Sequence, residues 1–135
     1  MMRPLNQRRE NLVGMTYTTV SITDLECKHP SVEVNCLVDT GALNCLLPSA
    51  LLYKIGARPE GSRVYELADG SKMEFSYCWV RLHVMGEDVF ARVLFGPDDV
   101  EAILGVIALE SAGLAVDPVT RTLKRLQVEY LKRVA

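Results

Sequence analysis

Short apolar runs that alternate with polar residues dominate the chain and predict an all-β domain. Alternation with a period of two is typical of half-buried strands, and β-branched and aromatic residues strengthen it. Strands are expected over residues 17–22, 31–38, 62–67, 72–84, 89–95, 114–116 and 122–128. Only two stretches favour a short helix, residues 48–55, with proline in the first turn and Gly56 at the end, and residues 107–112, followed by Gly113.

Turn residues join these strands into hairpins. Asp69-Gly70 between two strand-like runs is a strong hairpin signal, so residues 65–76 are expected to form a mobile β-hairpin with an exposed tip. The order of strand, turn, strand, short helix and glycine occurs over residues 17–56 and again over residues 78–113. This repeat suggests two halves related by a local two-fold axis.

Length and composition fit one small soluble domain. The chain has 135 residues, of which 49% are hydrophobic and 24% charged. Residues 16–128 are expected to form the domain, between a polar segment at 1–15 and a tail at 129–135. The formal net charge of -2 gives no basic field for nucleic acid. No apolar run reaches the roughly 20 residues of a membrane helix, so no membrane partner is expected.

The start of the chain lacks the apolar stretch of a secretory signal, which favours a cytoplasmic protein. The four cysteines (Cys27, Cys36, Cys45 and Cys78) form no CxxC pair and are expected to be thiols. Cys27-Lys28-His29 resembles half a metal site, but no second half is visible. We therefore expect neither a metal nor a cofactor.

Asp39-Thr40-Gly41 is the first candidate for chemistry. It follows the apolar strand end Cys36-Leu37-Val38, where an ionised carboxylate is costly unless it is paired or partly neutralised. An aspartate that simply begins a turn is the ordinary alternative, because the tripeptide alone is a weak signal. His83, which lies in an apolar strand, is more simply a surface histidine than a catalytic one.

The residues that follow Asp39-Thr40-Gly41 strengthen it as a candidate for chemistry. A helix, the Asp69-Gly70 hairpin, Ile103-Leu104-Gly105 and the run 114–118 follow in order. This string, over about residues 17–126, resembles the retropepsin-like clan of aspartic proteases, in particular its small bacterial and archaeal single-domain members. The resemblance implies an all-β, retropepsin-like acid-protease barrel with one or two short helices and a dimeric active site.

The resemblance also implies a role for each matching position. Asp39 would be the catalytic aspartate, the Thr40 hydroxyl would lock the loop to its symmetry mate, and Gly41 would let the backbone approach the substrate. Ala42 and Leu43 would contact the substrate. Ala68, Asp69, Gly70 and Ser71 would form the flap over it, and Ile103, Leu104 and Gly105 would hold the active-site loop from below.

Hydrolysis by this route needs two carboxylates that share a proton, one as the base and one as the acid. The chain has one Asp-Thr-Gly, so the second must come from another copy across a two-fold axis. Viral members commonly pair an acid after Asp-Thr-Gly-Ala with an arginine after the second glycine, where this chain has Leu43 and Val106. We expect Leu43 to lie against Val106, or within one residue of it, as an apolar replacement for that ion pair.

The sequence leaves two functions open. The first is an aspartic endopeptidase that acts on peptides or proteins as a homodimer, most active at acidic to mildly acidic pH. The second is a catalytically silent dimerisation or peptide-binding module with the same fold, because a fold alone does not establish an activity. An intact Asp39-Thr40-Gly41 favours the enzyme, since a pure scaffold has no need for that acid.

Overall fold

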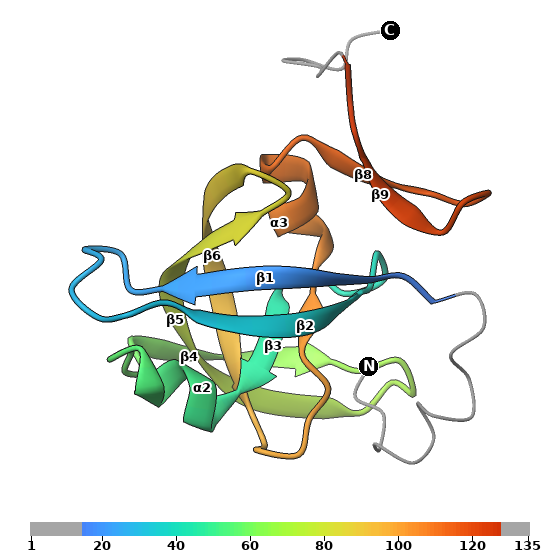
Figure 1. Ribbon diagram of the computed structural model, residues 1–135. Helices are drawn as coiled ribbons and strands as arrows, with labels where there is room; N and C mark the ends of the chain where they lie inside the picture. Colours follow the sequence, from blue (N-terminus) through green and yellow to red (C-terminus); the bar gives the residue numbers. More distant parts are fainter. Residues whose placement is uncertain (1–14, 128–135) are drawn as a thin grey trace, which may run out of the picture.

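The structure, a computed structural model, describes residues 15–127 of the chain (Figure 1). Most of the segment expected at 1–15 and the tail expected at 129–135 lie outside the described residues, so the domain boundaries stay predictions. The elements in residues 15–127 are β1 (Tyr17–Thr23), β2 (Val32–Val38), β3 (Cys45–Pro48), α2 (Ser49–Lys54), β4 (Gly61–Glu66), β5 (Lys72–Val84), β6 (Glu87–Gly96), β7 (Ile103–Leu104), α3 (Val106–Ser111), β8 (Leu114–Asp117) and β9 (Thr122–Arg125).

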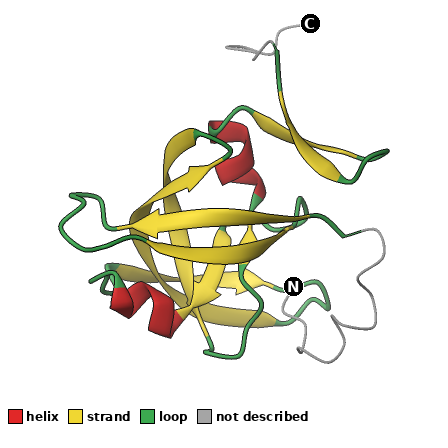
Figure 2. Cartoon of the chain, in the orientation of Figure 1, coloured by secondary structure: helices red, strands yellow, loops and turns green. Residues whose placement is uncertain are grey.

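The strands form a small barrel. A seven-stranded sheet in the order β1-β2-β7-β3-β6-β5-β4 closes on itself because β1 also pairs with β5, which leaves β4 outside the closed ring. The β2–β7 and β3–β6 pairs are parallel, and the other pairs of this sheet are antiparallel. Figure 2 shows the two short helices at opposite ends of the barrel, and Figure 1 shows the β8–β9 ribbon extending away from it.

The alternation in the sequence explains which faces are buried. Alternate residues of β5, from Cys78 to Val84, point into the barrel and are at most 1% exposed. From β6, the buried residues Val89, Ala91, Val93 and Phe95 join the same core. A second, smaller cluster of Leu46, Phe75, Leu94 and Ile103 lies outside the main core. This smaller cluster forms the base of the candidate site described below.

Most of the expected elements are present. The β5–β6 hairpin turns at Met85 and Gly86, which both have positive φ, so β6 begins at Glu87, two residues earlier than expected. Strand β3 is not among the expected strands, because its four residues are mostly buried and show no alternation that would indicate a strand. The repeat of strand, turn, strand and helix is seen as β1–β2–α2 and β5–β6–α3, with β3 and β7 inserted before the helices.

The cysteines act as small apolar side chains in the core. All four are free thiols, and Cys36, Cys45 and Cys78 are buried. Burial raises the pKa of Cys45 to about 11 and that of Cys78 to about 12, so both remain protonated at neutral pH. Each helix within residues 15–127 has six residues, and none is long or apolar enough to cross a membrane.

Candidate active site

The loop between β2 and β3 carries Asp39 at the end of a buried strand. Its backbone continues the parallel pairing of β2 with β7, since the Asp39 N–H donates to the Leu104 carbonyl at 3.0 Å. The chain then turns tightly, with the Ala42 N–H donating to the Asp39 carbonyl at 3.1 Å. The Gly41 N–H donates to Asp39 Oδ1 at 2.9 Å. Its own loop therefore holds the carboxylate; Asp39 as a residue is half-buried, while Thr40 and Gly41 are exposed.

The segment after β7 holds this loop from the other side. The Val106 N–H donates to the Ala42 carbonyl at 2.8 Å, and the Ile107 N–H donates to the Leu43 carbonyl at 3.3 Å. Gly105 fits against the backbone of Asn44, because a Cβ at position 105 would lie 2.6 Å from the Asn44 carbonyl carbon and oxygen. Ile103, Leu104 and Gly105 thus lie directly beneath the Asp39 loop.

The expectation that Leu43 lies within one residue of Val106 is confirmed for the backbone, because the Leu43 carbonyl accepts the N–H of Ile107, the next residue after Val106. Leu43 is 57% exposed, so its role as an apolar replacement for the ion pair stays a prediction. Val106 is half-buried and Ile107 is 44% exposed. The α3 start and Leu43 therefore present apolar groups on the same side of the molecule as the exposed Thr40 and Gly41.

A cavity of about 380 Å³ opens beside the Asp39 loop. Its lining is mostly apolar and comes from the loop, from the base of the β4–β5 hairpin and from the smaller core cluster: Gly41, Ala42, Leu43, Asn44, Leu46, Tyr65, Glu66, Leu67, Ala68, Phe75, Leu94 and Ile103. The Tyr65 hydroxyl donates to Asn44 Oδ1 at 2.9 Å, which links the hairpin to the loop across the cavity. The volume and lining suit an apolar side chain of a bound peptide.

The structure brings together only part of the expected substrate-binding set. Gly41, Ala42, Leu43 and Ala68 line the cavity, whereas Asp69, Gly70 and Ser71 lie beyond it at the exposed hairpin tip. Asn44 and Tyr65 were missed. The alternation of Tyr65 and Leu67 along the strand was the available signal, because it places both side chains on one face of the hairpin.

The hairpin over residues 65–76 is confirmed, and its mobility stays a prediction. Glu66 pairs with Lys72, and the Leu67 N–H donates to the Ser71 carbonyl at 2.7 Å. Gly70 has a φ of +85°, a conformation that glycine adopts without strain. The tip is exposed, as expected for a flap.

The tip offers a prediction about Asp69. The Ser71 hydroxyl donates to Asp69 Oδ1 at 2.6 Å and the Ser71 N–H at 2.9 Å, which lowers the pKa of the Asp69 carboxyl, the hydroxyl contributing most. Ser71→Ala is expected to raise that pKa toward its usual value. Because the folded-state pKa is depressed, the contribution to turn stability is present above the unfolded pKa and is lost as the pH falls through the folded one. A carboxyl NMR titration measures the shift, and an unchanged Asp69 titration would contradict the assigned bond.

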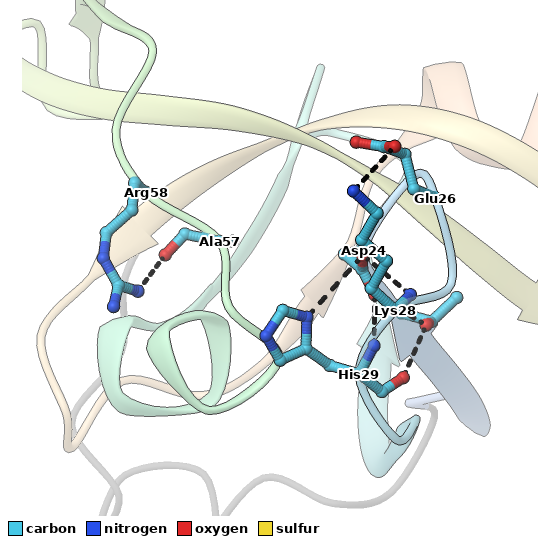
Figure 3. A network of polar contacts seen from close by, with 7 residues as sticks. Asp24, Glu26, Lys28, His29, Ala57 and Arg58 are labelled. Atoms are coloured by element: carbon cyan, nitrogen blue, oxygen red, sulfur yellow. Dashed lines mark hydrogen bonds and ion pairs between the residues drawn. The ribbon is translucent and has the colours of Figure 1, made fainter.

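Figure 3 shows the polar contacts of the loop between β1 and β2, where Asp24 lies among Lys28 and His29. Asp24 accepts the backbone N–H groups of Lys28 at 3.0 Å and His29 at 3.1 Å, and these bonds, chiefly the first, lower its pKa. The His29 ring lies over Gly56, where a Cβ would come within 2.4 Å of it. Within residues 15–127, no group of three histidine, cysteine, aspartate or glutamate side chains is arranged to hold a metal ion.

Comparison with known proteins identifies the fold. No family model and no curated protein matches the sequence. Among solved structures, the solution structure of a protease from simian foamy virus (mac) matches with a TM-score of 0.50 and 20% identity, over 70% of this chain and 91% of that one. The chain has a retropepsin-like fold. A foamy viral protease-reverse transcriptase in complex with an RNA/DNA hybrid matches with a TM-score of 0.51 and 21% identity, over 71% of this chain and 12% of that much longer chain.

These matches agree with the expected all-β barrel with two short helices. At such identities a match describes the fold and leaves activity and assembly open. The catalytic and binding roles of the residues named above therefore remain predictions.

Proposed function

We propose that the protein is an aspartic endopeptidase that works as a homodimer, with one Asp39 from each copy at the two-fold axis. The observation that carries the proposal is the position of Asp39. Its carboxylate accepts the Gly41 N–H, and Gly41 and Ala42 of the same loop line a mostly apolar cavity that a β-hairpin borders. A catalytic acid held next to a side-chain pocket is the arrangement that peptide hydrolysis requires.

The proposed reaction uses both carboxylates. One Asp39 carboxylate takes a proton from a water molecule, and the water oxygen attacks the carbonyl carbon of the peptide bond. The other Asp39, as the carboxylic acid, donates its proton to the carbonyl oxygen. The first Asp39 then passes the proton it took from water to the amide nitrogen, and the second Asp39 takes a proton from one hydroxyl of the tetrahedral intermediate as the C–N bond breaks. One new carboxyl group and one new amine are released, and the pair again holds one shared proton. Because two close carboxylates cannot both ionise easily, the pair keeps its shared proton at acidic pH.

The single chain presents one half of such a site. Thr40, Gly41 and Leu43 are exposed beside Asp39, as is Ile107 at the start of α3. These groups give a second copy an apolar and hydrogen-bonding surface around the two-fold axis. We also propose a cytoplasmic location, which the free thiols support because reducing compartments keep thiols unpaired.

The proposal is tested by peptide cleavage between pH 3 and 8, with a range of peptides bearing apolar residues and with a pepstatin-like transition-state mimic. The expected result is cleavage that is fastest at acidic pH, falls above roughly pH 5–6 and is blocked by the mimic. An alkaline optimum blocked by a serine-directed reagent would contradict it. No cleavage of any peptide, by a protein shown to be dimeric, would favour the silent peptide-binding module instead.

Mixing two versions of the chain tests the shared site. Adding an excess of Asp39→Asn protein to a fixed amount of wild type is expected to suppress cleavage, because most wild-type chains then pair with a partner that lacks the second carboxylate. Dilution of wild type alone should lower the activity per chain as dimers dissociate. Cleavage rates that stay constant per wild-type chain in both series would contradict a shared site. An excess of Asp98→Asn protein, altered at an exposed residue beside α2, serves as the control and should not suppress cleavage.

A further inference from the structure

The outer face of the β5–β6 hairpin carries a row of stacked aromatic rings and arginines. The Arg92 guanidinium lies 4.8 Å from the Tyr77 ring centroid and 5.1 Å from that of Trp79. The Arg81 guanidinium lies 4.9 Å from the Phe90 ring centroid. We call these five residues the aromatic–arginine face.

The strand register explains this row. Trp79 pairs with Arg92 and Arg81 pairs with Phe90, so these two aromatic residues each face an arginine across the two strands. Tyr77 pairs with Leu94, one step along the same face from Trp79. These side chains alternate with the residues of β5 and β6 that point into the main core. Gly61 of β4 makes room for the Tyr77 ring, since a Cβ there would lie 2.6 Å from its hydroxyl. The row is thus a built feature of the sheet.

The face is unusually exposed for aromatic side chains. Trp79 is 40% exposed and Phe90 is 62% exposed. Clustered exposed aromatic residues are typical of binding surfaces, where tryptophan and arginine carry much of the affinity.

The two arginines are held in place without a counter-charge. Within the described part of the chain, neither guanidinium makes an ion pair or a side-chain hydrogen bond, and the Nε atoms of both are buried without an acceptor. Stacking on a ring fixes the guanidinium plane, and a guanidinium held in this way can bind a carboxylate in a bidentate manner through its two terminal nitrogens. The acidic groups nearby are already engaged, because Glu60 accepts the Trp79 backbone N–H and Asp88 pairs with His83 at 2.8 Å.

From this geometry we infer that the aromatic–arginine face binds an extended acidic segment of a partner protein, with two carboxylates separated by one residue and an apolar or aromatic side chain beside them. Alternate side chains of an extended peptide are about 7 Å apart on one face. Arg81 and Arg92 are diagonal neighbours on the two strands, a relation with a spacing of about 7–8 Å. One carboxylate can therefore meet each guanidinium while the apolar side chain lies on Trp79 or Phe90.

Charge argues against other occupants. Residues 1–14 carry Arg3, Arg8 and Arg9 against a single acid, and residues 128–135 are also net basic, so both ends of the chain would be repelled by the arginines. A second copy placed face to face would oppose arginine with arginine. A nucleic acid strand binds through many phosphate contacts, and this face offers only two arginines, which suit a ligand with two carboxylates better.

The test uses Trp79, the one tryptophan of the chain, as the reporter of binding. The Asp39→Asn protein is titrated with a peptide that contains Glu-X-Glu next to phenylalanine and has no tryptophan, and the change in emission is followed. Using this variant prevents any cleavage, so the result does not depend on the proposed protease activity. The same peptide with lysine in place of glutamate, and an oligothymidylate, are titrated in parallel.

The acidic peptide is expected to change Trp79 emission and to bind more weakly as the salt concentration rises. Combined Arg81→Gln and Arg92→Gln substitutions should weaken binding about tenfold or more. The corresponding double lysine variant should recover only part of the loss, because lysine keeps the charge and lacks the planar fork. Arg63→Gln, which removes an exposed arginine on neighbouring β4, is the matched control and should bind as wild type does.

Circular dichroism and thermal melting show whether each variant is folded, and the single Arg92→Lys variant replaces any double variant that is not. The inference is overturned if the acidic peptide fails to bind at millimolar concentration, if the lysine peptide binds equally well, or if the arginine variants bind as tightly as the control. Binding of oligothymidylate that depends on these arginines, without binding of the acidic peptide, would replace the proposed partner with a nucleic acid.

Discussion

Asp39→Asn is expected to lower the rate of peptide cleavage by about a thousandfold or more, with little change in stability or in dimer formation. The asparagine side-chain oxygen can still accept the Gly41 N–H, which now binds Asp39 Oδ1 at 2.9 Å, so the loop keeps its shape. The amide can neither take a proton from water nor hold the shared proton. Initial cleavage rates, together with sedimentation and thermal melting of the variant, measure the three quantities separately.

Asp98→Asn is the matched control for this prediction. Asp98 Oδ1 accepts the Ala50 N–H at 3.0 Å at the start of α2, and an amide oxygen can take over that bond. The control removes the same charge from a site that is not part of the Asp39 loop, and its cleavage rate should stay within about twofold of wild type, as surface substitutions away from special features usually have small effects. Equal activity of the Asp39→Asn protein and wild type would remove Asp39 from the chemistry and the proposed function with it.

Local chemistry made the hairpins predictable. Asp69-Gly70 supplies the residue with positive φ that its turn requires, and Met85-Gly86 does the same between β5 and β6. Period-two alternation identified β1, β2 and the long β5, since a one-residue error would expose every core side chain. The position of Asp39 after a buried strand was visible for the same reason.

Contacts between segments that are far apart in the sequence were harder to predict. The four residues of β3 pair in parallel with β6, about fifty residues later in the chain, and a short apolar run carries no mark of such a partner. The pairing of β1 with β5, which closes the barrel, likewise has no mark in the sequence of either strand. The bond between Tyr65 and Asn44 exists only because the β4–β5 hairpin folds back to the active-site loop, so the cavity between them could not be derived from either segment alone.

Gly105 is the residue whose role depends most on such a contact. The resemblance implies that Gly105 supports the active-site loop but gives no reason for a glycine, and its ordinary φ of −86° gives no conformational reason either. The reason is steric, because a Cβ would lie 2.6 Å from the Asn44 backbone and 3.0 Å from the Leu43 carbonyl oxygen. Backbone atoms cannot move aside as the end of a flexible side chain can.

Gly105→Ala is therefore expected to destabilise the protein by about 1–3 kcal/mol, as overpacking in a well-packed region does. It should also slow cleavage, because the displaced loop carries Asp39, and shifts of about 1 Å in a catalytic group can cost about a hundredfold. Chemical denaturation gives the free energy of unfolding, and cleavage kinetics give the loss in rate below the unfolding transition.

Gly86→Ala is the control that separates a loss of stability from a loss of cleavage rate. Gly86 has a φ of +80° in the β5–β6 turn, where a Cβ meets only the end of the Arg125 side chain at 2.9 Å. A left-handed alanine costs about 1–2 kcal/mol, so this variant should lose comparable stability. It should nevertheless cleave at the wild-type rate while folded, since its turn has no contact with the Asp39 loop. If both variants lose activity only in proportion to their unfolded fraction, Gly105 is a packing residue alone and the segment 103–105 does not position the catalytic loop.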